Sequence, residues 1–98
     1  MRMMAIVEFD LEKGNEVVSS GAIDAIFKRV MDELRPEAAY FGPVNGQRGA
    51  YLIVNMDDSS KIPLFSETLF QEMHATIEWI PVMNADDLQR GLQQLPSQ

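Results

Sequence analysis

The side chains best suited to chemistry in this 98-residue chain are those of Glu8, His74 and Glu78. Glu8 and Glu78 each lie inside an otherwise apolar, strand-like run, and His74 is the only histidine. Two carboxyl groups that share a cleft of low dielectric constant can serve as a general acid and a general base. We therefore take these three residues as candidate catalytic groups. The alternative for both glutamates is an ordinary solvated position near a strand end.

His74 lies where a predicted helix meets a predicted strand. A single histidine can act as a general base or as an axial haem ligand. It can also bind the free carbonyl groups at the end of the helix, which is the simpler interpretation. The chain contains no cysteine, which excludes disulfides, thiolate metal sites and cysteine nucleophiles. We predict neither a metal site nor another cofactor.

Four further residues are candidates for ligand binding: Tyr40, Tyr51, Asn55 and Trp79. Tyrosine and tryptophan suit a ligand cavity because they combine an apolar ring with a polar tip. They are equally suited to a dimer interface or to packing within a sheet. Asn55 is placed to orient a polar ligand group or to bind the adjacent loop.

The net charge of -7 argues against nucleic acids and anionic membranes as partners, because both repel an acidic protein. A strand that binds RNA needs aromatic side chains at alternate positions, and Ala50, Leu52 and Asn55 occupy those positions here. No phosphate-binding glycine loop and no calcium loop is present in the sequence. The apolar N-terminal run is too short for a signal peptide or a membrane span, so the default expectation is a cytoplasmic protein.

The elements that must position these residues follow from the apolar pattern. Strands are predicted at 3–9, 38–42, 49–56 and 75–83, with a hairpin turn at Asn45-Gly46. Helices are predicted at 23–34, after a cap at Ser20, and at 60–72 and 85–95. The polar segment 10–19, which contains Gly14, is predicted to be a loop with at most an early helical turn.

This order of elements predicts a single α+β domain over residues 1–98, ferredoxin-like in topology, with an added C-terminal helix. Both central helices should lie on one face of an antiparallel sheet whose spatial strand order is fourth, first, third, second. The runs 3–9 and 51–56 are apolar on both faces, and 75–83 is nearly so, so the second face also needs cover. A second copy of the chain is the simplest cover, which predicts a homodimer. Leu88, Leu92 and Leu95 are expected to bury against the body or the partner.

The hairpin strand 49–58, the closing strand 75–83 and the following residues 85–88 resemble the dimeric α/β-barrel superfamily. That superfamily includes muconolactone isomerases, cofactor-independent quinol monooxygenases, haem-degrading monooxygenases, chlorite-dismutase-like proteins and small uncharacterised proteins, and the chain is most similar to the last group. The resemblance implies two ferredoxin-like protomers packed sheet to sheet, with the C-terminal segment bracing the partner. No catalytic motif of the family matches residue by residue, so the resemblance implies a fold and not an activity.

Three functions remain open. The first is binding of a small organic ligand in an apolar cleft, between sheet and helices or inside the barrel. The second is a cofactor-independent monooxygenase or isomerase that uses Glu8, His74 and Glu78, with Tyr51 or Asn55 positioning the substrate. The third is a structural or regulatory oligomer without catalysis. The second function depends on strand register, because a slip of one residue would place Glu8 and Glu78 on opposite faces.

Overall fold

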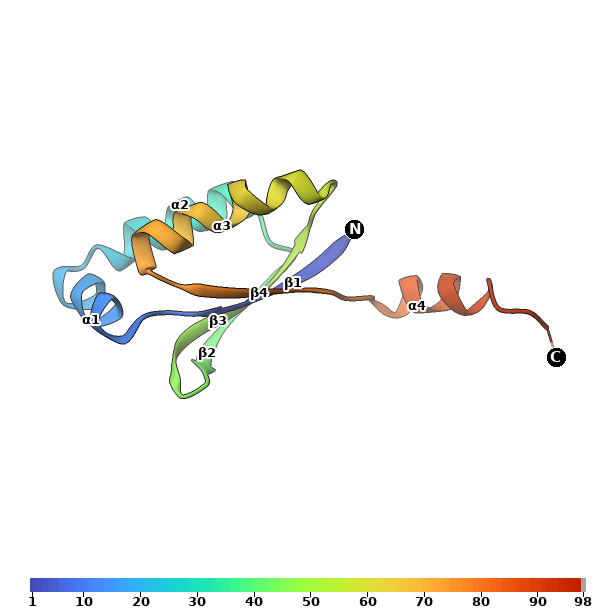
Figure 1. Ribbon diagram of the computed structural model, residues 1–98, viewed down its shortest axis with the longest axis horizontal. Helices are drawn as coiled ribbons and strands as arrows, with labels where there is room; N and C mark the ends of the chain where they lie inside the picture. Colours follow the sequence, from blue (N-terminus) through green and yellow to red (C-terminus); the bar gives the residue numbers. More distant parts are fainter. Residues whose placement is uncertain (98) are drawn as a thin grey trace.

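The computed structural model describes residues 1–97 and forms one antiparallel sheet with helices packed on one side (Figure 1). The elements follow in the order β1 (Arg2–Glu8), α1 (Leu11–Ser20), α2 (Ile23–Leu34), β2 (Ala38–Val44), β3 (Gln47–Asn55), a short 3-10 helix (Ser59–Lys61), α3 (Ile62–Met73), β4 (Thr76–Pro81) and α4 (Ala85–Leu92).

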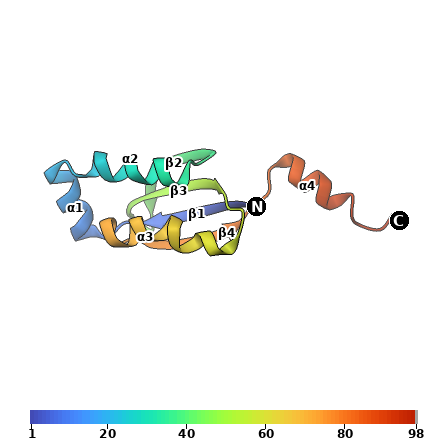
Figure 2. The ribbon, with the colours of Figure 1, turned by 90° about the horizontal axis from the view of Figure 1, so that it is seen from above.

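The strand order in the sheet is β2-β3-β1-β4, and every neighbouring pair is antiparallel. This confirms the predicted order and is consistent with a ferredoxin-like α+β fold. The predicted hairpin turn is also confirmed: Asn45 and Gly46 both have positive φ, 50° and 79°, as a tight turn between twisted strands requires. Figure 2 shows α2 and α3 side by side over the sheet, with α1 at one end.

The prediction of a loop at residues 10–19 is wrong, because most of this segment forms α1. Asp10 caps the helix by accepting a hydrogen bond of 2.9 Å from the backbone N–H of Lys13. Val17 and Gly14 are buried, and a Cβ atom added at Gly14 would lie only 3.2 Å from Nη1 of Arg48. The helix therefore depends on tertiary contacts, which outweigh the low helix propensity of glycine.

The other helix bounds are close to the predicted ones, with two differences in capping and length. Ser20 is the last residue of α1 and not the cap of α2, which begins after Ala22 without a side-chain cap. Pro63 lies in the first turn of α3, where its missing N–H costs nothing. The C-terminal helix begins at the predicted cap, Asn84, but ends at Leu92.

The core lies between the helices and one face of the sheet. Alternate residues of the two central strands point into it, and Leu52 is among the largest side chains that are fully buried. From the helices, the core takes buried residues of α1, α2 and α3. The core residues of the central strands are Met3, Ala5 and Val7 in β1, and Ala50, Leu52 and Val54 in β3.

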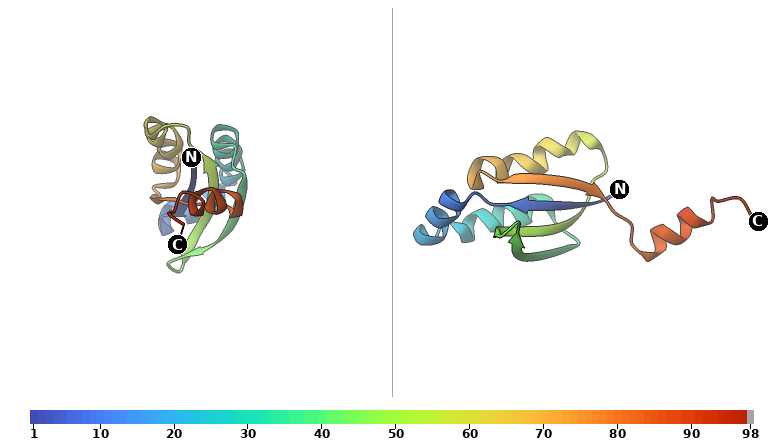
Figure 3. Two further views of the ribbon diagram at one scale, coloured as in Figure 1. Left: turned by 90° about the vertical axis from the view of Figure 1, so that its right-hand side faces the viewer. Right: turned by 60° about the horizontal axis from the view of Figure 1, so that its bottom comes forward.

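The opposite face of the sheet is uncovered by any helix of the described residues, as the right-hand view of Figure 3 shows. We call it the open face. It is formed by the alternate residues of each strand that point away from the core. These are Arg2, Met4, Ile6 and Glu8 in β1, Ala38, Tyr40, Gly42 and Val44 in β2, Gln47, Gly49, Tyr51, Ile53 and Asn55 in β3, and Thr76, Glu78 and Ile80 in β4.

The C-terminal helix α4 extends away from the end of the sheet (Figure 1). The chain measures 59 × 26 × 17 Å, and its radius of gyration is 15.8 Å, whereas a compact chain of this length would have about 13 Å. No residue of α4 is buried. Leu88, Leu92 and Leu95 are 45% to 63% exposed. The prediction that they bury against the body is therefore wrong, and burial against a partner stays a prediction.

A group of charged side chains fixes the first turn of α4 to the sheet. Arg2 binds Glu37 through its Nε atom at 2.8 Å and binds Asp87 through Nη1. Asp87 also pairs with Arg90. The backbone N–H of Asn84, followed by the two arginines, lowers the pKa of the Asp87 carboxyl group below its ordinary value of 3.8.

We expect the attachment of α4 to depend on pH. Because the pKa of Asp87 is lowered in the folded chain, its contacts stabilise the attachment above pH 3.8 and are lost as the pH falls through the lowered value. At neutral pH, Asp87→Asn should therefore raise the backbone mobility of α4, measured by 15N relaxation. The control is Asp86→Asn, which removes a neighbouring carboxylate outside the ion pairs. Equal mobility in the two variants would contradict this assignment.

Candidate functional site

The open face is the candidate functional site, because strand register brings most of the chemically capable residues onto it. One transverse row of paired residues crosses all four strands as Tyr40, Tyr51, Ile6 and Glu78. The next row toward the N-terminus of β1 is wholly apolar and consists of Ala38, Ile53, Met4 and Ile80. The row on the other side consists of Gly42, Gly49, Glu8 and Thr76.

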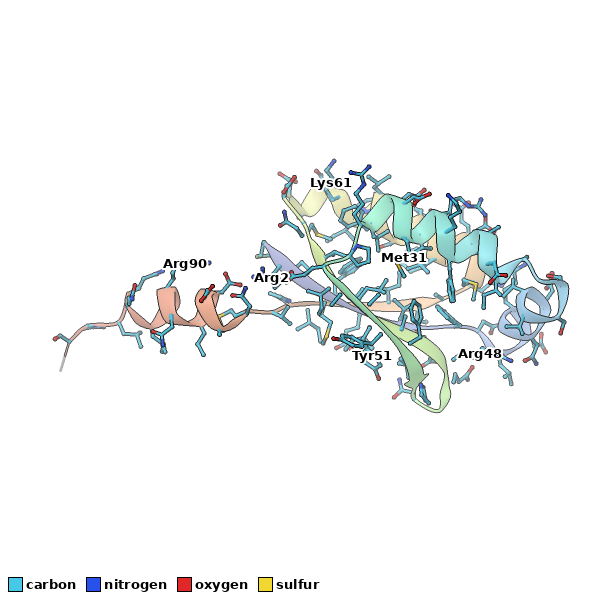
Figure 4. All side chains as sticks on the ribbon, turned by 180° about the vertical axis from the view of Figure 1, so that it is seen from behind. Arg2, Met31, Arg48, Tyr51, Lys61 and Arg90 are labelled. Atoms are coloured by element: carbon cyan, nitrogen blue, oxygen red, sulfur yellow. The ribbon has the colours of Figure 1, made fainter. Side chains whose placement is uncertain are left out.

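Apolar and aromatic side chains occupy the middle of this face. Tyr51 lies on the side of the sheet away from the helices, whereas Met31 lies between α2 and the sheet (Figure 4). The Tyr51 hydroxyl donates a hydrogen bond of 3.1 Å to the carbonyl oxygen of Pro43, which holds its ring across β2. Tyr40 is 67% exposed. Met4, Ile6, Tyr51 and Ile53 are half-buried, so each leaves part of its apolar surface open to solvent in the single chain.

Glu8 and Glu78 lie on the same face, which resolves the register question. Ile6 pairs with Glu78, and Glu8 pairs with Thr76, so the two glutamates occupy diagonal positions on neighbouring strands. Such positions are about 7–8 Å apart. The Glu8 Oε1 atom accepts a hydrogen bond of 2.9 Å from Nδ2 of Asn45 in the hairpin turn. The arrangement places two carboxylates beside the aromatic row.

His74 lies just outside the open face. It is the residue that ends α3, with a positive φ of 49°, and its backbone N–H donates to the carbonyl oxygen of Leu69. The side chain is exposed, and β4 begins only at Thr76. His74 is therefore at the same end of the sheet as Glu8, but strand register does not join it to the two glutamates.

Asn55 lies at the other end of the open face. It pairs with Arg2, six residues along β1 from Glu8, a separation of about 20 Å at the rise of a strand. Its side-chain oxygen accepts a hydrogen bond of 3.2 Å from the N-terminal amino group, and its Nδ2 donates to Asp57 at 3.4 Å. Both contacts are local to the ends of β1 and β3, which agrees with the interpretation that Asn55 binds the adjacent loop.

Trp79 lies on the helix side of the sheet and is not part of the open face. Its Nε1 donates a hydrogen bond of 3.0 Å to the hydroxyl of Ser66 in α3, a residue that is almost fully buried. Its ring lies 6.5 Å from that of Phe65. Trp79 is therefore half-buried and packs against the core, and it is separated from Tyr51 and Glu78 by the thickness of the sheet.

The sequence reasoning missed the role of Arg2. This residue and the first turn of α4 border a polar cavity of about 450 Å³ beside the N-terminus. The carboxylates of Glu37 and Asp87 already bind the guanidinium group of Arg2, so the cavity offers no free positive charge from that residue. The only feature of the sequence that could have indicated this role is the position of Arg2, a charged residue at the start of an apolar strand.

Among residues 1–97, no cluster of three or more histidine, aspartate or glutamate side chains could hold a metal ion. None of the helices in the same residues is both long enough and apolar enough to cross a membrane.

Comparison with known proteins gives no relative. The chain matches no protein-family model, no curated protein and no solved structure.

Proposed function

We propose that the chain acts as a homodimer whose two open faces pack against each other and enclose an apolar cavity for a small organic ligand. The observation that carries the proposal is the open face itself. Its two central rows hold Tyr40, Tyr51, Ile6, Met4 and Ile53 with no helix over them. An apolar sheet face of this kind is normally buried.

The exposed area of the single chain supports this proposal. The chain exposes 6495 Å², whereas a folded monomer of 11.1 kDa is expected to expose about 5,700 Å². The excess is about 800 Å², which is close to the area that each partner contributes to a standard protein interface. The open face and the extended helix α4 both contribute to this excess, and the proposed dimer would cover both.

The geometry of α4 also supports a second copy as the partner. Its leucine stripe is exposed, and the ion pairs of Arg2 and Asp87 hold its first turn at the end of the sheet. A helix that is amphipathic and has no core contact of its own is stabilised by packing against another surface. In the proposed dimer, Leu88 and Leu92 pack on the body of the partner subunit.

The side chains of the open face define the ligand chemistry that we propose. The rings of Tyr40 and Tyr51 and the side chain of Ile6 form an apolar floor, and Glu8 and Glu78 stand at one end of it. Carboxylates accept hydrogen bonds and donate none when they are ionised. The matching ligand is therefore a small apolar molecule that carries an N–H or O–H donor at one end.

Native mass spectrometry of the protein, freshly purified from cells, tests the proposal. We expect a mass of twice 11.1 kDa, together with added mass from a retained small molecule. A dimer without added mass, before and after incubation with cell metabolite extract, would favour a purely structural or regulatory oligomer. A monomer at micromolar concentration would overturn the dimer and with it the enclosed cavity.

The second candidate function is a cofactor-independent monooxygenase or isomerase. The observation that favours it is the placement of Glu8 and Glu78 on one face beside the aromatic row. In an isomerase, one carboxylate removes a proton from the substrate and the other carboxyl group, in its protonated form, returns a proton at another position. In a monooxygenase, the carboxylate would remove the proton and dioxygen would be the co-substrate that oxidises the resulting anion.

For an enzyme, Glu8→Gln and Glu78→Gln should each lower turnover of the co-purifying ligand by about 100-fold or more. Gln keeps the shape of the side chain, so the melting temperature should change little. Glu12→Gln in α1 is the control, because it removes an exposed carboxylate on a different element. Unchanged turnover in both variants would exclude these glutamates as acid and base. If the unmodified protein shows no turnover and both variants still bind the ligand as it does, the result would support a binding protein.

A further inference from the structure

A second cavity lies on the helix side of the sheet, between the α1–α2 end of the helical layer and the β2–β3 hairpin. Its volume is about 490 Å³, which is within the range of small-molecule sites. The side chains around it are mainly apolar and include Phe9, Val18, Ile23 and Phe41. Phe41 and Arg48 alternate with the open-face residues of β2 and β3, so their side chains belong to the helix side of the sheet. Gly42, Gln47 and Gly49, which also line the cavity, share the register of the open face.

Three phenylalanine rings form one wall of the cavity. The ring of Phe27 lies 5.8 Å from that of Phe9 and 5.2 Å from that of Phe41, with interplanar angles of 42° and 34°. These separations are typical of favourable aromatic packing. Phe41 is nevertheless 54% exposed, which leaves much of its ring without a packing partner. A further planar ring in the cavity would complete this cluster.

Arg48 adds a positive charge to the same cavity. Its Nη1 donates a hydrogen bond of 2.9 Å to Oδ1 of Asn15 in α1, and the missing side chain at Gly14 gives the guanidinium group room against that helix. Figure 4 shows Arg48 between the β2–β3 hairpin and α1. The side chain is thus held at a defined place on the cavity wall.

The charge of Arg48 is not neutralised by a carboxylate. Arg48 takes part in none of the ion pairs formed within residues 1–97, and the same is true of Arg35 and Lys61. Of these three residues, only Arg48 lines the cavity. A guanidinium group binds a carboxylate through two parallel hydrogen bonds, so an anionic ligand would satisfy it.

We propose that this cavity is a binding site for a small aromatic carboxylate. The aromatic ring packs against Phe27 and Phe41, and the carboxylate binds the guanidinium group of Arg48.

The first test is a titration of the 15N-labelled protein with 4-hydroxybenzoate, followed by amide chemical shifts. We expect saturable shifts at Phe41, Gln47 and Arg48. The neutral probe 4-hydroxybenzyl alcohol, which keeps the ring and the hydroxyl group, should bind about tenfold more weakly because it lacks the charge-assisted bonds. Shifts that do not saturate, or that fall only on residues of the open face, would overturn the proposal.

Variants at the cavity provide the second test. Arg48→Gln should weaken binding of 4-hydroxybenzoate by about tenfold and leave binding of the alcohol unchanged. Arg35→Gln is the matched control, because it removes the same charge from an exposed position away from the cavity. Val18→Phe should fill the cavity and weaken both probes. Equal affinity of 4-hydroxybenzoate for Arg48→Gln and the unchanged protein would contradict the proposed site.

Discussion

Replacing Ile6 by aspartate is expected to convert the proposed dimer into a folded monomer. Ile6 lies in the middle of the open face, between Tyr51 and Glu78. In a symmetric dimer the substitution places two carboxylates in the interface, and each buried, unpaired charge costs several kcal/mol. The dissociation constant should therefore rise by about a thousandfold or more. In the monomer the same side chain faces solvent, so the fold is retained.

Analytical ultracentrifugation measures this change over a range of protein concentrations, and circular dichroism checks the fold. Leu64→Asp is the matched control. Leu64 is an apolar residue of α3 that is 52% exposed, and α3 packs on the side of the sheet opposite to the open face. This variant should remain a dimer. Dimers of equal strength from both variants would place the interface elsewhere.

Replacing Trp79 by alanine is expected to lower the free energy of unfolding by about 3 kcal/mol. The substitution removes a large ring that packs against Phe65, and it leaves the buried hydroxyl of Ser66 without its donor. The total stability of a domain of this size is about 5–15 kcal/mol, so the loss is a large fraction of it. Trp79→Phe should cost less, because the ring is kept and only the hydrogen bond is lost.

Formation of the proposed dimer would add to apparent stability, so both variants are best measured by urea denaturation in the Ile6→Asp background, which we expect to be monomeric. Trp79 is the only tryptophan, so circular dichroism replaces fluorescence as the probe. Tyr40→Ala is the control, since Tyr40 points to solvent in the single chain and its loss should cost within about 0.5 kcal/mol. A cost for Trp79→Ala as small as that of the control would refute the core position.

The strand pattern was sufficient to predict the sheet. The runs that begin at Met3 and Tyr51 are apolar on both faces, and these strands are the central pair of the sheet. The signal was strong because both faces of a central strand must avoid water. The hairpin could be predicted from Asn45-Gly46 alone, because few other residue pairs accept positive φ at two successive positions.

The features that the sequence did not reveal depend on contacts between distant residues. Helix α1 contains Gly14 and Asn15, which disfavour helices, and its contact with Arg48 across 33 positions could not be read from periodicity. Trp79 lies on one face of the sheet or the other according to the register of β4. A shift of one residue in that register would move its side chain to the opposite face. The extension of α4 could not be predicted because Leu88 and Leu92 give the same pattern whether they pack on their own chain or on another.

Solvent exposure of the isoleucine methyl groups in the unmodified protein tests the sheet-to-sheet dimer most directly. A soluble paramagnetic agent broadens the NMR signals of exposed methyl groups, with Ile62, 37% exposed, and buried Ile26 as internal references. Ile6, Ile53 and Ile80 all lie on the open face. If the open faces pack together, these three signals should be protected like that of Ile26. Broadening of all three to the extent seen for Ile62, at concentrations up to about 1 mM, would contradict the dimer.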